Sequence, residues 1–134
     1  MKGLTRIHHV GVAVTDLDES IELYRSAFGG ELIHRATNDR EGLEAAFIRT
    51  GSGEVELMHA TREDSPVGKF VAKRGPGLHH VAYAVADIEL ALKQAKEAGV
   101  ELIDAAPRPG MHGGRIAFLH PKSVGGVLTE LVEP

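Results

Sequence analysis

The stretch Leu78-His79-His80-Val81-Ala82-Tyr83-Ala84-Val85 decides how this chain is expected to fold. It is short, alternating and rich in β-branched residues, a pattern that predicts a β-strand. Alternation puts His80 on a face with small residues and His79 on the bulky face that seeks a core. The small side chains leave open space in front of His80. A histidine in that position is a candidate metal ligand or acid–base group.

The same pattern occurs earlier in the chain, as Ile7-His8-His9-Val10-Gly11-Val12-Ala13-Val14. The likeness continues after each strand. Asp16-Leu17 corresponds to Asp87-Ile88, a helical pattern follows in both copies, and the next segment begins at Gly30 in one copy and Gly99 in the other. A repeat with a period near half the chain indicates a duplicated unit rather than a solenoid. The chain is therefore expected to consist of two copies of one module.

Each module is predicted to contain a strand, a helix and three further strands. The first helix follows Asp16, an N-cap with Glu19 three residues later, and ends at Gly29-Gly30. Its predicted buried stripe is Leu17, Ile21, Tyr24 and Phe28. The second helix follows Asp87. The predicted strands are residues 7–14, 31–35, 43–50, 54–59, 78–85, 100–103, 115–120 and 127–132.

The repeat predicts a single α+β domain over residues 1–134, made of tandem βαβββ modules. Module one covers about residues 5–60 and module two about 78–134. The linker at about 61–77 contains a short helix, because Asp64-Ser65-Pro66 combines a cap with proline at the first helical position.

Composition excludes several classes of function. The 134 residues carry a net charge of −4 and few aromatics, which argues against nucleic-acid binding. The absence of cysteine excludes disulfides, thiolate metal sites and a cysteine nucleophile. No signal region or membrane-spanning run is apparent, so we expect a cytoplasmic protein with no membrane partner.

The fourth strand of each module carries a glutamate between apolar residues. A pseudo-twofold relation between modules would bring together His9, Glu56, His80 and Glu130. One strand histidine or glutamate usually has no special role, but four at equivalent places in two repeats favour a site. Two imidazoles and two carboxylates suit a divalent ion in octahedral geometry with two open positions, and do not suit a closed structural zinc site. His8 and His79 point to the opposite faces and are expected to pack.

Several segments carry a resemblance to a known family. They are Ile7–Val14, Val55-Glu56-Leu57-Met58, Asp64–Phe70, Gly77–Val81, Phe118-Leu119-His120-Pro121-Lys122-Ser123 and Gly126–Leu131. On these residues the chain resembles the vicinal oxygen chelate superfamily and, within it, the methylmalonyl-CoA epimerases. The resemblance implies a half-open eight-stranded cup that holds one divalent ion per chain, with Co²⁺ favoured and Mn²⁺, Ni²⁺, Mg²⁺ or Zn²⁺ as alternatives. It also implies a homodimer.

The resemblance implies epimerisation of methylmalonyl-CoA, an acyl-CoA whose C2 proton lies between a thioester carbonyl and a carboxylate. Chelation of both oxygens would stabilise the enolate. Glu130 is the candidate base. Some relatives have a second base on the third strand where this chain has Ala45, so that second base is open. Glu44 is adjacent but expected on the other face, and His112 is a further candidate.

Basic residues near the predicted mouth of the cup are candidate contacts for a carboxylate or for CoA phosphates. They are Arg108, Arg115 and Lys122, and the resemblance adds His120 in its His-Pro-Lys-Ser segment. Two alternatives stay open: a glyoxalase I-like isomerase, which shares the His/Glu/His/Glu pattern, and a ligand-binding member of the superfamily without catalysis.

Overall fold

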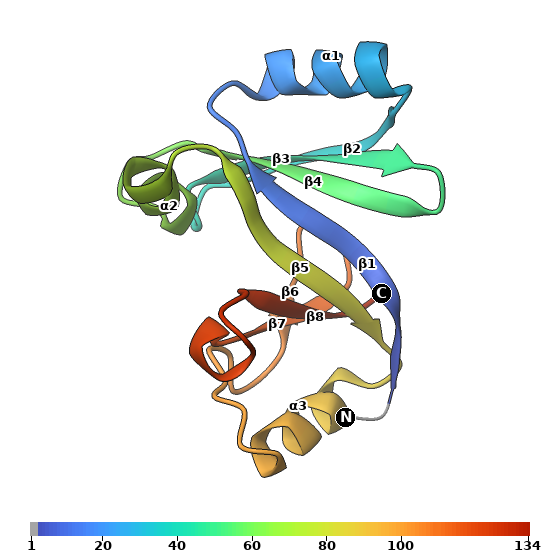
Figure 1. Ribbon diagram of the computed structural model, residues 1–134, viewed down its shortest axis with the longest axis vertical. Coiled ribbons are helices and arrows are strands. Elements are labelled where there is room, and N and C mark those ends of the chain that lie inside the picture. The colour runs from blue at the N-terminus through green and yellow to red at the C-terminus, as the bar shows by residue number, and fades with distance from the viewer. Residues whose placement is uncertain (1–2) are drawn as a thin grey trace. The chain divides into compact units, whose positions relative to one another are not determined.

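The computed structural model describes residues 3–134. Figure 1 shows its helices and strands. The strands are β1 (Leu4–Ala13), β2 (Glu31–Asn38), β3 (Leu43–Thr50), β4 (Gly53–Ala60), β5 (Gly77–Val85), β6 (Arg108–Pro109), β7 (Arg115–Leu119) and β8 (Thr129–Glu133). The helices are α1 (Leu17–Phe28), α2 (Pro66–Arg74) and α3 (Ile88–Glu97), with a 3₁₀ turn at Pro121–Ser123. No helix in this described part of the chain is long and apolar enough to cross a membrane.

The strands follow the order β2-β3-β4-β1-β5-β8-β7-β6. The chain divides into two compact units. One unit is His9–His79, and the other joins the described residues up to His8 with His80–Pro134. The strands β1 and β5 each have residues in both units.

In the unit His9–His79, β3 pairs antiparallel with β2 and β4, and β4 pairs parallel with the second half of β1. The helix α1 packs on β3 and β4 (Figure 1). The Asp16 side chain accepts the Glu19 backbone N–H at 3.0 Å, as the capping pattern predicts. Gly29 ends the helix in the left-handed conformation. The core beneath α1 consists of Leu17, Ile21, Ala46, Ile48 and Leu57.

One part of the predicted stripe on α1 is wrong. Leu17 and Ile21 are buried, but Phe28 is 65% exposed. Phe28 is the last residue of the helix, beyond the area that the strands cover, and its ring meets the edge of Tyr24 at 5.2 Å.

The helix α2 begins as the sequence predicts, with Ser65 as its cap and Pro66 at its first position. The Ser65 hydroxyl accepts the Gly68 N–H at 3.0 Å and donates to the Arg62 carbonyl at 2.6 Å. A Cβ at Gly68 would lie 2.6 Å from the Arg62 oxygen, so only glycine allows this close approach.

In the second unit β8 lies between β5, which runs parallel to it, and β7, which runs antiparallel. The first half of β1 lies beside β5, where the Thr5 hydroxyl donates to the Ala84 carbonyl at 3.3 Å. The helix α3 packs on β7 and β8 (Figure 1). Four of its residues are buried against these strands: Ile88, Ala91, Leu92 and Ala95.

The strand predicted at residues 100–103 is wrong. The structure has one isolated bridge there, between Leu102 and Leu119, and the strand β6 lies further on, at Arg108–Pro109. The Phe118 carbonyl accepts both the Ile103 and the Asp104 N–H, which bends the chain away from a regular ladder. Proline at positions 107 and 109 removes ladder donors and keeps β6 short.

Candidate active site

The register of the strands places a buried glutamate next to a buried histidine in the unit His9–His79. Glu56 on β4 lies opposite Gly11 on β1 and Phe47 on β3. His9 precedes Gly11 by two residues and therefore points to the same face. The His9 Nε2 atom is 3.2 Å from Glu56 Oε1, and the two residues are 1% and 5% exposed.

The second unit repeats this arrangement. Glu130 on β8 lies opposite Ala82 on β5 and Phe118 on β7. His80 precedes Ala82 by two residues, and its Nε2 atom is 3.7 Å from Glu130 Oε1. His80 is 1% exposed and Glu130 is 4% exposed.

A phenylalanine supports each histidine from the neighbouring strand. Phe47 meets the His9 ring edge-on at 5.8 Å and 87°, and Phe118 meets His80 at 5.5 Å and 83°. Such edge contacts restrict the orientation of an imidazole. Each unit therefore holds a histidine, a glutamate and a phenylalanine at equivalent places.

The chemistry of these pairs fits a divalent ion. A buried carboxylate is costly unless it is paired, hydrogen-bonded or bound to a metal. Each pair offers one imidazole nitrogen and carboxylate oxygens, and the chain has no thiolate that would favour a softer site. The residues that could hold an ion are thus His9 and Glu56 in one unit and His80 and Glu130 in the other.

Glu44 lies on the opposite face of β3, as alternation predicts. Arg35 donates to Glu44 at 3.3 Å and to Asp18 of α1 at 2.6 Å. The hydrogen bonds to Asp18 and Glu44 raise the pKa of Arg35. Ala45 is buried on the face that carries Phe47, so the His9 face has a methyl group at this position.

Arg115 lies on the α3 face of β7, away from His80. Its guanidinium is 2.6 Å from Glu89 and 2.9 Å from Glu133, and these two bonds raise the pKa of Arg115. Glu133 also accepts the N–H of Ile88 at the start of α3, and this bond, with Arg115, lowers the pKa of Glu133. The substrate contact predicted for Arg115 stays a prediction.

His120 and Lys122 begin the 3₁₀ turn after β7. The Nδ1 atom of His120 accepts the Lys122 N–H at 3.1 Å, so the imidazole caps the turn. Glu101 Oε2 lies 3.9 Å from the same nitrogen. The Lys122 side chain is exposed. Their predicted contact with substrate stays a prediction.

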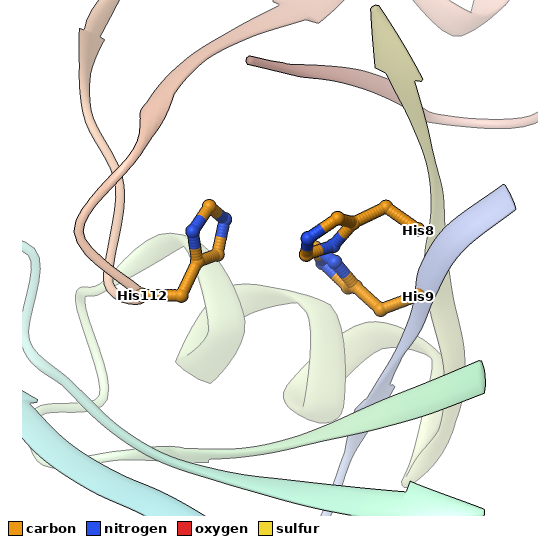
Figure 2. Close-up of side chains that lie close together, drawn as sticks. All are labelled: His8, His9 and His112. Carbon is orange, nitrogen blue, oxygen red and sulfur yellow. The ribbon is translucent and has the colours of Figure 1, made fainter. Parts of the chain in front are cut away.

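His8 and His112 belong to one unit and lie close together. In Figure 2 the two rings extend toward one another, His8 from β1 and His112 from the loop before β7. Their centroids are 5.0 Å apart, and Gly114 donates its N–H to His112 Nδ1 at 3.4 Å. His79 packs edge-on against Phe70 at 4.9 Å. The ring contact of His79 with Phe70 is a packing contact, and the roles predicted for His8 and His79 stay predictions.

One residue bound to the backbone of Phe118 was not among the residues predicted from the sequence. Asp104 accepts the Phe118 N–H at 2.8 Å and the Arg108 Nε–H at 3.2 Å. Arg108 lies over the Phe118 ring, 5.6 Å from its centroid. The available signal was the spacing of Asp104 and Arg108, four residues apart. Because the chain between them is irregular, that spacing did not predict which way either side chain points.

In the other unit the exposed His34 ring stacks on Phe47 at 6.1 Å.

Comparison with known proteins now identifies the family. A family model described as the glyoxalase/bleomycin resistance protein/dioxygenase superfamily matches residues 8–118. The chain belongs to this superfamily.

Relatives within the superfamily are named as epimerases. The ethylmalonyl-CoA/methylmalonyl-CoA epimerase of Cereibacter sphaeroides is 37% identical over 94% of this chain and 96% of its own. A crystal structure of methylmalonyl-CoA epimerase from Mycobacterium tuberculosis has a TM-score of 0.94 and 39% identity over 100% of this chain and 91% of its own. A methylmalonyl-CoA epimerase in complex with methylmalonyl-CoA and NH4+ has a TM-score of 0.93 and 43% identity, covering 97% and 94%. The predicted fold class and the resemblance to these isomerases are confirmed.

Proposed function

We propose that this chain is a metal-dependent epimerase that interconverts (2R)- and (2S)-methylmalonyl-CoA. One observation carries the proposal: a buried His–Glu pair stands at equivalent places in two repeated modules. The epimerase relatives, at 37% to 43% identity, support the choice of reaction and of an acyl-CoA substrate.

In this proposal His9, Glu56, His80 and Glu130 together bind one divalent ion per chain, Co²⁺ being favoured. The ion would stabilise negative charge on the thioester and carboxylate oxygens of the substrate. The protein's own contribution is to hold the four ligands. The edge contacts of Phe47 and Phe118 fix the two imidazoles, and burial keeps water from the carboxylates.

Glu130 is the proposed base. The distance from Glu130 Oε1 to His80 Nε2 is 3.7 Å, whereas the distance from Glu56 Oε1 to His9 Nε2 is 3.2 Å. Glu130 therefore makes the longer contact with its histidine. Glu130 takes the C2 proton, the electron pair of the C–H bond becomes a carbon–carbon double bond, and the π pair of the thioester carbonyl moves to its oxygen. These shifts reverse when a second acid–base group, whose identity stays open, donates a proton to the opposite side of C2, and the centre is inverted. Ala45 offers no acid–base group, and Glu44 pairs with Arg35 on the α1 face, so the identity of a second base stays open.

The assembly and location are part of the same proposal. We infer that the protein is a homodimer and acts in the cytoplasm. Sedimentation of the purified protein tests whether it is a dimer.

The activity is tested by following hydrogen exchange at C2 in D₂O. The purified protein is given methylmalonyl-CoA and, in parallel, the hemithioacetal substrate of glyoxalase I. We expect deuterium to enter only methylmalonyl-CoA. Conversion of the hemithioacetal alone would assign the glyoxalase alternative, and binding without either reaction would assign the non-catalytic alternative.

A further inference from the structure

The ring of Phe118 supports the imidazole of His80. It meets that imidazole edge-on at 5.5 Å, and Phe118 lies opposite Glu130 in the pairing of β7 with β8. A side chain that packs against a metal-binding histidine limits the directions in which its nitrogen can point. The position of the Phe118 ring therefore matters for any ion that His80 binds.

The two units hold this phenylalanine in different ways. In one unit the equivalent residue is Phe47, and the strand β2 pairs along its outer side, with His34 in register. In the other unit β6 pairs with the first two residues of β7, and Phe118 lies beyond that pairing. Phe118 thus needs a different partner on the side of β7 that faces away from β8.

Asp104 is that partner. Its Oδ2 atom accepts the Phe118 backbone N–H at 2.8 Å, and the backbone N–H groups of Ile103 and Asp104 donate to the Phe118 carbonyl at 2.9 and 3.2 Å. The other carboxylate oxygen of Asp104 accepts the Arg108 Nε–H at 3.2 Å, and the Arg108 guanidinium lies over the Phe118 ring, 5.6 Å from its centroid. Asp104 therefore holds Phe118 at its N–H, at its carbonyl and, through Arg108, at its ring.

We propose that Asp104 is a positioning residue for the metal ion: by fixing Phe118 it sets the direction of the His80 imidazole and raises the affinity of the site for a divalent ion. This inference rests on the proposed function, which takes His80 and Glu130 as ligands of that ion. Groups that orient a ligand tune metal binding without touching the ion. Because a single side chain takes the place of a paired strand here, its loss should affect the ion.

The test measures Co²⁺ binding by the metal-free purified protein. Asp104→Ala should weaken Co²⁺ binding by about 10-fold, the lower end of the range for groups that orient a metal ligand. The visible absorption spectrum of the protein saturated with Co²⁺ should also change, because it reports the arrangement of the ligands around the ion. Asp104→Asn keeps an acceptor for the Phe118 N–H and should recover most of the affinity.

Asp64→Ala is the matched control. Asp64 also accepts the Nε–H of an arginine, Arg62, at 3.0 Å, but this pair lies just before α2 in the other unit. The control should leave the Co²⁺ affinity and the spectrum unchanged.

Phe118→Leu is a second variant, which covers the case that Asp104→Ala does not fold in a thermal melt. It keeps the backbone bonds to Asp104 but removes the ring beside His80, so it should also lower the Co²⁺ affinity and change the spectrum. Adding Asp104→Asn to Phe118→Leu should weaken binding little further, since both substitutions act through the same ring.

Two results would overturn the inference. Wild-type affinity and spectrum in Asp104→Ala would show that Asp104 does not act on the ion, and an equal loss of affinity in Asp64→Ala would show a general effect of lost stability. Failure of the proposed function shows separately in the wild type. Absence of Co²⁺ binding would reject the metal site and this inference with it, whereas Co²⁺ binding without C2 exchange would reject the reaction alone.

Discussion

His9 Nε2 lies 3.2 Å from Glu56 Oε1, with both side chains buried on one face of paired strands. The same relationship recurs between His80 and Glu130 at 3.7 Å. Duplication of a module explains why both pairs sit at the same register, each with a phenylalanine on the next strand. Because each module has one such imidazole and one such carboxylate, loss of either pair should halve the proposed set of metal ligands.

Replacing His80 should abolish metal binding, while replacing its neighbour should not. We expect His80→Ala to lose the ion and the C2 exchange, because it removes a buried nitrogen donor. His79→Ala should retain about one ion per chain and melt at a lower temperature, because it loses the edge contact with Phe70. Metal analysis after dialysis and thermal melting measure the two effects. Loss of metal in His79→Ala, with metal retained in His80→Ala, would reverse the face assignment.

Glu130→Gln should separate catalysis from metal binding. Glutamine keeps one oxygen donor but cannot take a proton, so the variant should retain some metal and lose about 10²- to 10⁴-fold of the C2 exchange rate. Glu44→Gln is the matched control, because Glu44 pairs with Arg35 on the α1 face. Near-normal exchange in Glu130→Gln would reject its role as the base and leave Glu56 as the carboxylate to test.

The Ser65 hydroxyl should contribute measurably to stability. It is fully buried, caps α2 and also donates to the Arg62 carbonyl. Ser65→Ala removes both bonds, so we expect the free energy of unfolding to fall by about 1–2 kcal/mol. Urea unfolding measures the change. Ser26→Ala, which removes one exposed bond to the Glu22 carbonyl within α1, is the control and should cost less.

Local patterns predicted most of the elements because they reflect local physics. The caps at Asp16, Ser65 and Asp87 each satisfy a backbone N–H that a helix leaves exposed, and short-range spacing suffices to find them. The His–Glu pairs were found because the repeat supplied the long-range information that one strand lacks.

The errors arose where tertiary contacts decide the outcome. Residues 100–103 have the apolar pattern of a strand, but the Phe118 carbonyl accepts the N–H groups of both Ile103 and Asp104. The strand that pairs with β7 forms further on, at Arg108–Pro109. Phe28 fits the helical stripe but lies past the end of the sheet surface. The ion pairs of Arg115 with Glu89 on α3 and Glu133 on β8 could not be predicted either, because sequence spacing does not relate these residues to one another.

Protonation of Glu133 should weaken the fold in acid. The Ile88 N–H and Arg115 bond the ionised form of this carboxylate and lower its pKa below the ordinary value of 4.5. A group with a lowered folded-state pKa stabilises the fold above its unfolded pKa, and this contribution is lost as the pH falls through the folded-state value. Stability should therefore decline below about pH 4.5 in part because Glu133 takes up a proton.

Glu133→Gln tests this contribution. We expect the variant to be less stable than the wild type at pH 7 and to lose less stability between pH 5 and pH 3, since its side chain no longer titrates. Urea unfolding at a series of pH values measures both. Glu97→Gln, at the exposed end of α3, is the matched control and should keep the wild-type slope. Parallel stability curves for Glu133→Gln and the wild type would show that the bonds to Ile88 and Arg115 do not couple folding to this proton.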